Sequence, residues 1–558
     1  MLDGKTTIRH TAIIIGMWLV LAFPPLFTRD LWNPDEPRYM EVAREMVVLK
    51  QYVVPYLNGE AYPDKPPLFF WAAGLLWKLG LGVHAGQVVA GLSSLGTMLM
   101  VYFFCRRFMD PRTALWAVAT LASTLMFALY AGIGVIDPVL SFLVCGTVLL
   151  GYTAMQPDTA RPALWWLATY GLAGLAVLTK GPVGVLLPWL ILLLFGALRQ
   201  TRPATGRAWG HLAGQLLLAG IVLGWVALAC KAGGPQYTFD LLVKQSAGRV
   251  ASSYSHRNPF YYYLVQWPYY FFPWSLSLPL ALWAAVRKRA SARSGVPLLA
   301  AVWVGVYVVV FSLISGKRMG YLLPMAPAVA MLTGHYLTAG LQAHPRWRTA
   351  HLWLFGIGLG LLTLVPLGFL AGVFCAVPVA GRVGVDEEVL SVLRQAATPQ
   401  RMIVAVAVLL LPLAAASAGL WLLLRRKRPV AWLLVAAVLS LFFGVQVSVV
   451  PVVNHFKSGK AFCEEAAPYL AGAKEVCLYP QDFSGVYNLY TGRVRMPVIA
   501  TPSELRAALQ DPEKMVIADK RHVEEDLAPA EVRAYTLMER SVGHRPMVVL
   551  GTPVPGGG

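Results

Sequence analysis

Acids, bases and aromatic residues gather at the edges of apolar segments in a chain where only 13% of residues are charged. After the first apolar run come Asp35, Glu36 and Arg38, and the same loop ends with Tyr62 and Lys65. Carboxylates beside cations can stabilise a developing charge and orient an acceptor group. Because loops that only connect two spans are usually short, a long loop with these groups indicates a reaction site.

A second acid and several cations lie between later apolar runs, most of them in short turns. Asp137 precedes a proline at the start of one such run. The cations are Lys180, Arg249, Lys317 and Arg318, and Tyr321 follows the last two. Lysine binds phosphate as a point charge and arginine can bind it bidentately, so cations that converge on one membrane surface predict a phosphate site.

Each of these residues also has an ordinary structural explanation. Asp35 and Asp137 both lie beside prolines at expected helix starts, where aspartate commonly caps the helix. A single exterior cation usually contacts a lipid headgroup. The aromatic runs 260–263 and 267–272 are typical of an interface belt. The combination of two acids with several cations on one face favours a site over these separate explanations.

The composition requires a membrane setting. Hydrophobic residues make up 57% of the 558 residues, which include 18 Trp and 23 Tyr, so we expect a polytopic α-helical membrane protein with aromatic belts. The net charge of +19 comes mostly from short basic runs beside apolar segments, where the positive-inside rule explains it, and nucleic-acid binding is rejected. The first apolar run continues to Phe27 without a cleavage site and is expected to be retained as a span.

Thirteen apolar runs are long enough to be candidate membrane spans. They cover residues 11–27, 86–105, 113–131, 139–155, 163–179, 182–198, 211–230, 270–286, 296–314, 321–341, 351–376, 402–424 and 431–453. Residues 68–82 form a shorter run, and counting it as a span would reverse the orientation of everything after it. Treating it as a helix in the membrane interface places the basic loops on one side, as the cytoplasm requires. The exterior side then holds the loop 28–67, the turns at Asp137 and Lys180, the segment 233–267, the turn 316–320 and the C-terminal region.

The chain is expected to contain two domains. Residues 1–453 form the transmembrane domain, and within it the exterior loop 28–82 carries two interfacial helices, since apolar residues recur at helical spacing in 36–50. Residues 454–558 alternate expected strands at 474–479, 494–500 and 515–518 with helices at 483–490 and 503–509, which predicts a small soluble α/β domain. That domain has no glycine-rich phosphate loop, so no cofactor is expected. Cys463 and Cys477 could pair or remain free thiols.

The order of the motifs resembles that of the bacterial aminoarabinose transferases, which belong to the GT-C superfamily of lipid-linked-sugar glycosyltransferases and are relatives of the protein O-mannosyltransferases. The motifs occupy residues 34–39, 65–67, 137–138, 178–182, 256–262 and 317–324. The likeness covers the chain from its N-terminus to about residue 327. Each motif alone is common, and their combined order is specific.

The resemblance implies a multi-pass enzyme of the bacterial inner membrane. Such an enzyme moves 4-amino-4-deoxy-L-arabinose from undecaprenyl phosphate to a lipid A phosphate on the periplasmic side, which weakens the binding of polymyxin and other cationic peptides. It implies Asp35 as the principal catalytic carboxylate and Asp137 as the second acid. The carrier phosphate would be held by Tyr62, Lys65, Arg249 and Tyr321. Arg257 is an alternative to Arg249 in this role. Glu36, Arg38, Lys180, Lys317 and Arg318 are expected as further substrate contacts, and no metal or partner chain is implied.

Two other functions remain open at this point. A related enzyme could transfer the lipid-linked sugar to a protein hydroxyl instead of lipid A. A flippase for lipid-linked sugars would keep the membrane setting without the transfer chemistry. Transport predicts acids deep inside the spans and internal repeats, and neither is visible in the sequence. Direct single displacement with inversion is the expected reaction.

Overall fold

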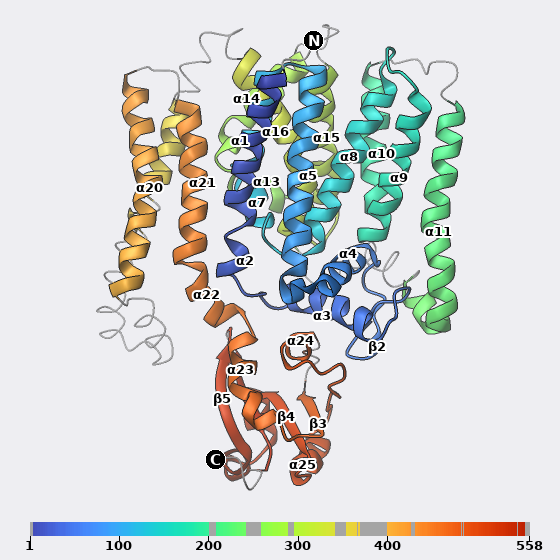
Figure 1. Ribbon diagram of the computed structural model, residues 1–558, viewed down its shortest axis with the longest axis vertical. Coiled ribbons are helices and arrows are strands. Elements are labelled where there is room, and N and C mark those ends of the chain that lie inside the picture. Colours follow the sequence, from blue (N-terminus) through green and yellow to red (C-terminus); the bar gives the residue numbers. More distant parts are fainter. Residues whose placement is uncertain are drawn as a thin grey trace. The chain divides into compact units, whose positions relative to one another are not determined.

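The computed structural model describes residues 4–199, 208–241, 258–287, 295–340, 353–364, 367–368, 399–425, 430–480, 483, 485–543 and 545–552 (Figure 1). Arg249 and Arg257 lie outside these residues. The chain divides into two compact units. We call Met1–Phe27, Pro63–Phe69 and Gln87–Ser448 the helical unit, and Thr28–Tyr62, Phe70–Gly86 and Val449–Gly558 the composite unit.

The helical unit makes the chain a polytopic membrane protein. Among the described residues, eight helical segments are long and apolar enough to cross a membrane. They contain α1 (Gly4–Ala22), α5 (Ala85–Phe108), α8 (Ile136–Met155), α9 (Pro162–Lys180), α11 (Ala208–Phe239), α15 (Gly295–Leu313), α20 (Pro399–Leu424) and α21 (Val430–Ser448). Helix α9 packs between α8 and α11 (Figure 1).

The other five predicted runs are broken, short or only partly described. The run 182–198 is α10 (Val183–Arg199), which has 17 residues, and 351–376 is described as a helix only at Trp353–Leu364. Three runs are interrupted. The run 113–131 gives α6 (Pro111–Ala122) and α7 (Leu125–Tyr130), and 321–341 gives η6 (Met319–Met325), α16 (Ala326–His335) and η7 (Tyr336–Gly340). The run 270–286 begins at the last residue of α13 (Tyr262–Tyr270) and continues as η4 (Trp274–Leu276) and α14 (Leu278–Arg287). Between α6 and α7 the hydroxyls of Ser123 and Thr124 donate to carbonyls one turn back, which competes with continuation of the helix.

The loop after α2 (Pro25–Thr28) folds into two helices and a short hairpin. Helix α3 (Asp35–Val48) is followed by strands β1 (Tyr56–Leu57) and β2 (Glu60–Ala61), which are joined by Asn58 and Gly59 with positive φ values of 58° and 74°. Helix α4 (Leu68–Leu76) packs on α3 at Gly74, where an added Cβ would be 3.4 Å from the Ala43 carbonyl oxygen. The short helices η1 (Trp77–Leu81) and η2 (Gly82–His84) separate α4 from α5, because Gly80 has a φ of 92°. Residues 68–82 therefore do not continue α5, and their interfacial position stays a prediction.

The C-terminal part of the composite unit is a small α/β fold. Strands β3 (Glu475–Tyr479), β4 (Lys514–Asp519), β5 (Thr536–Val542) and β6 (Arg545–Leu550) form a sheet in the order β3-β4-β6-β5, in which only β3 and β4 run parallel. The helices are α22 (Val450–Lys457), α23 (Lys460–Leu470), α24 (Tyr487–Thr491), α25 (Pro502–Gln510), α26 (Lys520–Asp526) and α27 (Pro529–Tyr535). The predicted strands at 474–479 and 515–518 are confirmed. The strand predicted at 494–500 is wrong, since only an isolated bridge joins Leu478 to Val498.

The two faces of this sheet separate the two cysteines of the domain. Successive residues of a strand point to opposite faces, so Leu478 joins one apolar cluster and Cys477 the other. Cys463, on α23, packs in the cluster that contains Leu478. Both thiols are buried and free, so the disulfide left open by the sequence does not form.

Candidate active site

An ion pair joins the start of α8 to the end of α9 in the helical unit. The Lys180 ammonium nitrogen lies 2.5 Å from Asp137 Oδ1, and each side chain is 18% exposed. The N-cap of α8 is Val135, and Asp137 follows as the second helical residue. Asp137 is therefore not the N-cap residue that its position before a proline suggested. Helix α9 ends at Lys180 because Gly181 takes a φ of 78°, and a cation at a helix C-terminus is favourable.

Tyr321 completes this group from a third element, η6. The Lys180 ammonium lies 4.7 Å from the centroid of the Tyr321 ring, which is within range of a cation–π interaction. Gly320 allows the close approach, since a Cβ at that position would lie 3.0 Å from the Asp137 carboxyl carbon. The structure thus brings together Asp137, Lys180 and Tyr321, which are separated by up to 184 residues in the sequence. An ammonium group held in this way can meet a phosphate beside an apolar surface.

Lys317 and Arg318 build the turn that precedes η6. Lys317 is only 3% exposed, and its ammonium donates to the carbonyl of Ile314 in the same turn. The side chain of Arg318 is exposed, while its backbone N–H donates to the Tyr263 hydroxyl at 3.1 Å and its carbonyl accepts from that hydroxyl at 2.9 Å. Tyr263 was not among the predicted site residues, and its position in an aromatic run concealed this role. Substrate contact by Lys317 or Arg318 stays a prediction.

Asp35 is the first residue of α3 in the composite unit. The N-cap position belongs to Pro34, which makes no side-chain cap, so Asp35 lies within the first turn. Here a carboxylate is stabilised by the positive end of the helix dipole. The Asp35 side chain is half-buried, as is that of Arg38.

Glu36, next to Asp35, is buried in an ion pair with Arg29. Arg29 Nη1 donates to Glu36 Oε1 at 2.6 Å, and the Trp32 backbone N–H donates to Oε2 at 3.0 Å. The two charged side chains are 4% and 3% exposed. Glu36 therefore supports the loop that leads into α3, and its expected substrate contact stays a prediction. Sequence reasoning missed Arg29, although its spacing of seven residues from Glu36 was visible.

Tyr62 and Lys65 flank the boundary between the two units in the sequence. Tyr62, in the composite unit, donates its backbone N–H to Pro55 at 2.8 Å, and its ring centroid lies 6.4 Å from that of Phe70. Lys65, in the helical unit, is half-buried just before α4. Their roles at the carrier phosphate stay predictions.

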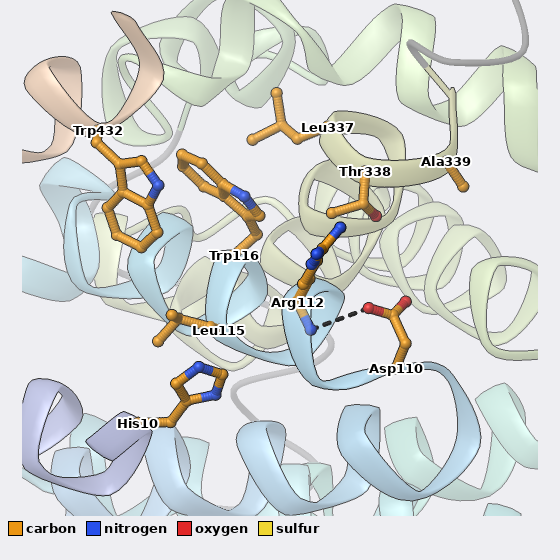
Figure 2. Close-up of a pocket in the computed structure, with 9 residues that line it drawn as sticks. All are labelled: His10, Asp110, Arg112, Leu115, Trp116, Leu337, Thr338, Ala339 and Trp432. Carbon is orange, nitrogen blue, oxygen red and sulfur yellow. Dashed lines mark hydrogen bonds between the residues drawn. The ribbon is translucent and has the colours of Figure 1, made fainter. Parts of the chain in front are cut away.

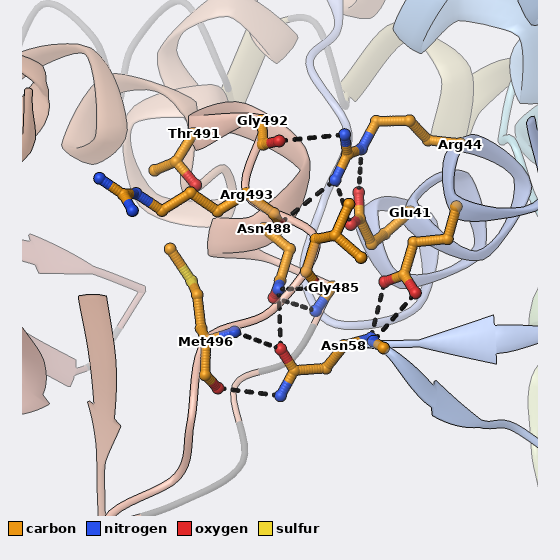
Figure 3. A network of polar contacts seen from close by, with 12 residues as sticks. Glu41, Arg44, Asn58, Gly485, Asn488, Thr491, Gly492, Arg493 and Met496 are labelled. Carbon is orange, nitrogen blue, oxygen red and sulfur yellow. Dashed lines mark hydrogen bonds and ion pairs between the residues drawn. The ribbon is translucent and has the colours of Figure 1, made fainter. Parts of the chain in front are cut away.

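Arg44 links α3 to the segment after α24 (Figure 3). Its guanidinium donates twice to Glu41, at 2.6 and 2.7 Å, and also to the carbonyls of Gly492 at 3.1 Å and Arg493 at 3.2 Å. Arg44 is 7% exposed and Glu41 is fully buried. Burial raises the pKa of Glu41, while the hydrogen bond and charge of Arg44 oppose that rise.

Asn58, at the turn of the β1–β2 hairpin, makes a second link of the same kind (Figure 3). Its side chain donates to the Met496 carbonyl at 2.9 Å and accepts from the Met496 N–H at 2.7 Å and from Asn488 Nδ2 at 3.0 Å. The backbone N–H groups of Asn58 and Gly59 donate to Glu45 at 2.6 and 3.0 Å. Burial, with the neighbouring Glu41 charge, raises the pKa of Glu45 to about 8 despite these donors.

A cavity of about 530 Å³ opens elsewhere in the helical unit (Figure 2). It is lined by His10, Asp110, Arg112, Leu115, Trp116, Leu337, Thr338, Ala339 and Trp432. Asp110 caps α6 by accepting from the N–H groups of Arg112 and Thr113, both at 2.9 Å. This cavity contains none of the predicted site residues. Within the described ranges, no group of three or more His, Cys, Asp or Glu side chains is arranged to hold a metal.

Comparison with known proteins relates the chain to lipid-linked-sugar transferases. The model of the family described as dolichyl-phosphate-mannose-protein mannosyltransferase matches residues 64–225. Undecaprenyl phosphate-alpha-4-amino-4-deoxy-L-arabinose arabinosyl transferase 1 of Pseudomonas fluorescens is 31% identical over 64% of each chain. The corresponding transferase of Pseudomonas aeruginosa is 30% identical over 66% of each chain. These alignments span a little under two thirds of the relatives' own length.

A solved structure matches the fold over nearly the whole chain. ArnT from Cupriavidus metallidurans, crystallised with undecaprenyl phosphate, has a TM-score of 0.75 at 22% identity, with 99% of this chain and 100% of that chain covered. The match confirms the predicted GT-C type of fold, with helical spans and a small C-terminal α/β domain. The chain is thus similar to undecaprenyl phosphate-aminoarabinose arabinosyl transferases, in sequence over a little under two thirds of its length and in fold over nearly all of it.

Proposed function

We propose that this chain transfers 4-amino-4-deoxy-L-arabinose from undecaprenyl phosphate to a phosphate group of lipid A. The observation that carries the proposal is the group formed by Asp137, Lys180 and Tyr321, a cation beside a carboxylate and an aromatic ring at the ends of apolar helices. The names of the relatives and the carrier lipid bound to the Cupriavidus protein support this choice of donor. Adding the amino sugar would mask negative charge on lipid A and lower its affinity for polymyxin and other cationic peptides.

The proposal places the enzyme in the bacterial inner membrane, with the reaction on the periplasmic side. The predicted thirteen spans and interfacial helices give the first loop, the Asp137, Lys180 and Lys317 turns and the C-terminal domain the same exterior orientation. An acceptor carried on lipid A reaches the enzyme from that membrane surface. The domain boundary at residues 453 and 454 belongs to the same proposal.

The leaving group is the phosphate of the carrier lipid, and its charge determines which catalytic groups the reaction needs. The bond between the sugar C1 and the carrier phosphate oxygen breaks, and the electron pair remains with the phosphate. Cations such as Lys65 and Lys180 stabilise the charge that develops there without delivering a proton. A general acid is therefore not required.

The acceptor phosphate is largely ionised near neutral pH, so it needs little deprotonation before it attacks C1. The Asp35 carboxylate can instead stabilise an oxocarbenium-like transition state or pair with the amino group of the sugar. A new bond between C1 and the lipid A phosphate oxygen forms as the bond to the carrier breaks. Single displacement of this kind inverts the configuration at C1.

The experiment is a transfer assay with purified enzyme, aminoarabinose-charged carrier and lipid A. We expect Asp35→Asn to fold and to bind undecaprenyl phosphate normally while losing transfer. Asp158→Asn, which changes an exposed aspartate in the helical unit, is the matched control and should keep full activity. Full transfer by Asp35→Asn would contradict the assigned role, whereas absence of transfer by the wild-type enzyme would contradict the function.

A protein hydroxyl is the second candidate acceptor, because the matched family model describes protein mannosyltransferases. Mass spectrometry of lipid A from cells with and without the gene separates the two candidates. Transfer to lipid A predicts a pentosamine-sized mass difference that depends on the gene. Modified proteins with unchanged lipid A would favour the alternative.

A further inference from the structure

Asn454, on α22, holds the loop that leads to Asp35. Its side-chain oxygen accepts from the Asp30 backbone N–H at 3.2 Å and from the Trp32 indole N–H at 2.9 Å. Its side-chain nitrogen donates to the Thr28 carbonyl at 2.9 Å. One amide thus fixes three residues of the loop, all within the composite unit.

Neighbouring contacts reinforce this attachment. The Asn33 backbone N–H donates to the Lys457 carbonyl at 2.9 Å, at the last residue of α22. The Lys460 ammonium lies 3.7 Å from Asp30 Oδ1. The loop from Thr28 to Asn33 is therefore bound along its length to the beginning of the C-terminal domain.

The same loop is tied to the first turn of α3. Glu36 receives hydrogen bonds from Arg29 and from the Trp32 backbone, and the Arg29 guanidinium carbon lies 4.2 Å from the centroid of the Trp32 ring. Trp32 belongs to both sets of contacts, since its indole N–H reaches Asn454 and its backbone N–H reaches Glu36. A continuous series of contacts runs from Asn454 to the residue next to Asp35.

The other end of α3 is attached to the same domain. Arg44, near the end of the helix, donates to the Gly492 and Arg493 carbonyls, and the hairpin that follows is held through Asn58 and Asn488. With both ends fixed, α3 cannot shift along its axis without breaking hydrogen bonds.

We propose that Asn454 is a positioning residue for Asp35, and that the C-terminal domain serves the reaction as the frame that holds α3. This inference rests on the proposed function and assigns a role to the domain within it. Displacement of a reacting group by about 1 Å can cost about 100-fold in rate. Loss of the Asn454 amide should therefore lower kcat more than it lowers carrier affinity. A purely structural role would reduce the amount of folded enzyme without changing the kcat of the folded fraction.

The test compares three variants in the purified full-length enzyme. Asn454→Ala removes all three hydrogen bonds, and we expect kcat to fall by about 10- to 100-fold while the affinity for undecaprenyl phosphate changes less than about twofold. Asn454→Asp keeps the acceptor for Asp30 and Trp32 and loses the donor to Thr28, so its kcat should lie in between. Gln510→Ala, which removes an exposed amide in the same domain, is the matched control and should leave kcat unchanged.

Hydrogen exchange supplies a readout that does not depend on activity. In Asn454→Ala the backbone amides of residues 28–36 should exchange faster than in the wild type, and in Gln510→Ala they should not. If the wild-type enzyme transfers the sugar and Asn454→Ala matches Gln510→Ala in kcat and exchange, the inference is wrong. Equal losses of kcat and carrier affinity would also overturn it. If Asn454→Ala does not fold, Asn454→Asp decides by the same measurements.

Discussion

Breaking the ion pair between Asp137 and Lys180 should destabilise the helical unit. Replacing both residues should lower the free energy of unfolding by less than the sum of the two single replacements. Asp137→Asn leaves the Lys180 ammonium beside the Tyr321 ring without its carboxylate. Lys180→Met keeps the length and apolar stem of the side chain but leaves the Asp137 carboxylate without its cation. In the double variant neither charge remains to be compensated.

The geometry sets the expected magnitude. Each side chain is 18% exposed, so the pair lies between a surface pair, worth about 0–1 kcal/mol, and a buried one, whose rupture costs about 3–5 kcal/mol. We expect a loss of about 2 kcal/mol for Asp137→Asn. Lys180→Met should lose about 1 kcal/mol more, because it also removes the contact with the Tyr321 ring. The double variant should recover about 1–2 kcal/mol relative to the sum of the single losses.

The assay is the free energy of unfolding of the purified protein in detergent, obtained from denaturant titration. Lys231→Met removes an exposed cation from α11 and is the control, with an expected change below about 0.5 kcal/mol. Losses that add within about 0.3 kcal/mol in the double variant would refute the coupling. Carrier affinity separates the functional role of Lys180, since Lys180→Met should weaken the binding of undecaprenyl phosphate about tenfold or more if its ammonium contacts the phosphate.

Two further predictions concern the composite unit. The pKa of Glu45 is raised to about 8, against about 4.3 in an unfolded chain, so stability is lost as pH rises between these values. Glu45→Gln should therefore flatten this part of the profile of unfolding temperature against pH. Gly485→Ala should lower the free energy of unfolding by about 1–2 kcal/mol because Gly485 has a φ of 87°. It should cost more than this because the added Cβ would lie 2.7 Å from the Arg38 Cα. Gly492→Ala, with a φ of 73° and open space around its Cβ, should lose only the first part, and equal losses in denaturant titration would contradict the Arg38 contact.

Periodicity and turn residues predicted much of the fold, and the failures have physical causes. The apolar strands β3 and β4 and the helix α25 follow local patterns, and all three were predicted. The hairpin of β5 and β6 was missed because Glu539, Arg540 and Ser541 interrupt the apolar pattern of β5. The segment 494–500 has strand-like residues, but it lies where only one bridge to β3 forms.

The sequence indicated several residues of the candidate site, but it did not predict how they are arranged. Charge out of place in an apolar chain indicated Asp137 and Lys180, and the structure pairs them. No pattern in the neighbouring sequence distinguished Asn454, because its hydrogen bonds are to a loop more than 400 residues earlier. Such pairings arise from tertiary structure, and a single sequence contains no signal for them.

The composite unit is built from segments that lie far apart in the chain, so it cannot finish folding until the last segment has been synthesised. Asp30 and Asn454 are 424 residues apart in the chain. At a synthesis rate of 5–20 residues per second, the first loop waits roughly 20 to 85 s for its partner to be made. During that interval the side chains of Arg44 and Asn58 lack the carbonyls to which they donate hydrogen bonds in the folded protein. The loop that carries Asp35 can therefore reach its final conformation only after the spans have been synthesised. A chain interrupted before α22 would lack the contacts that hold this loop.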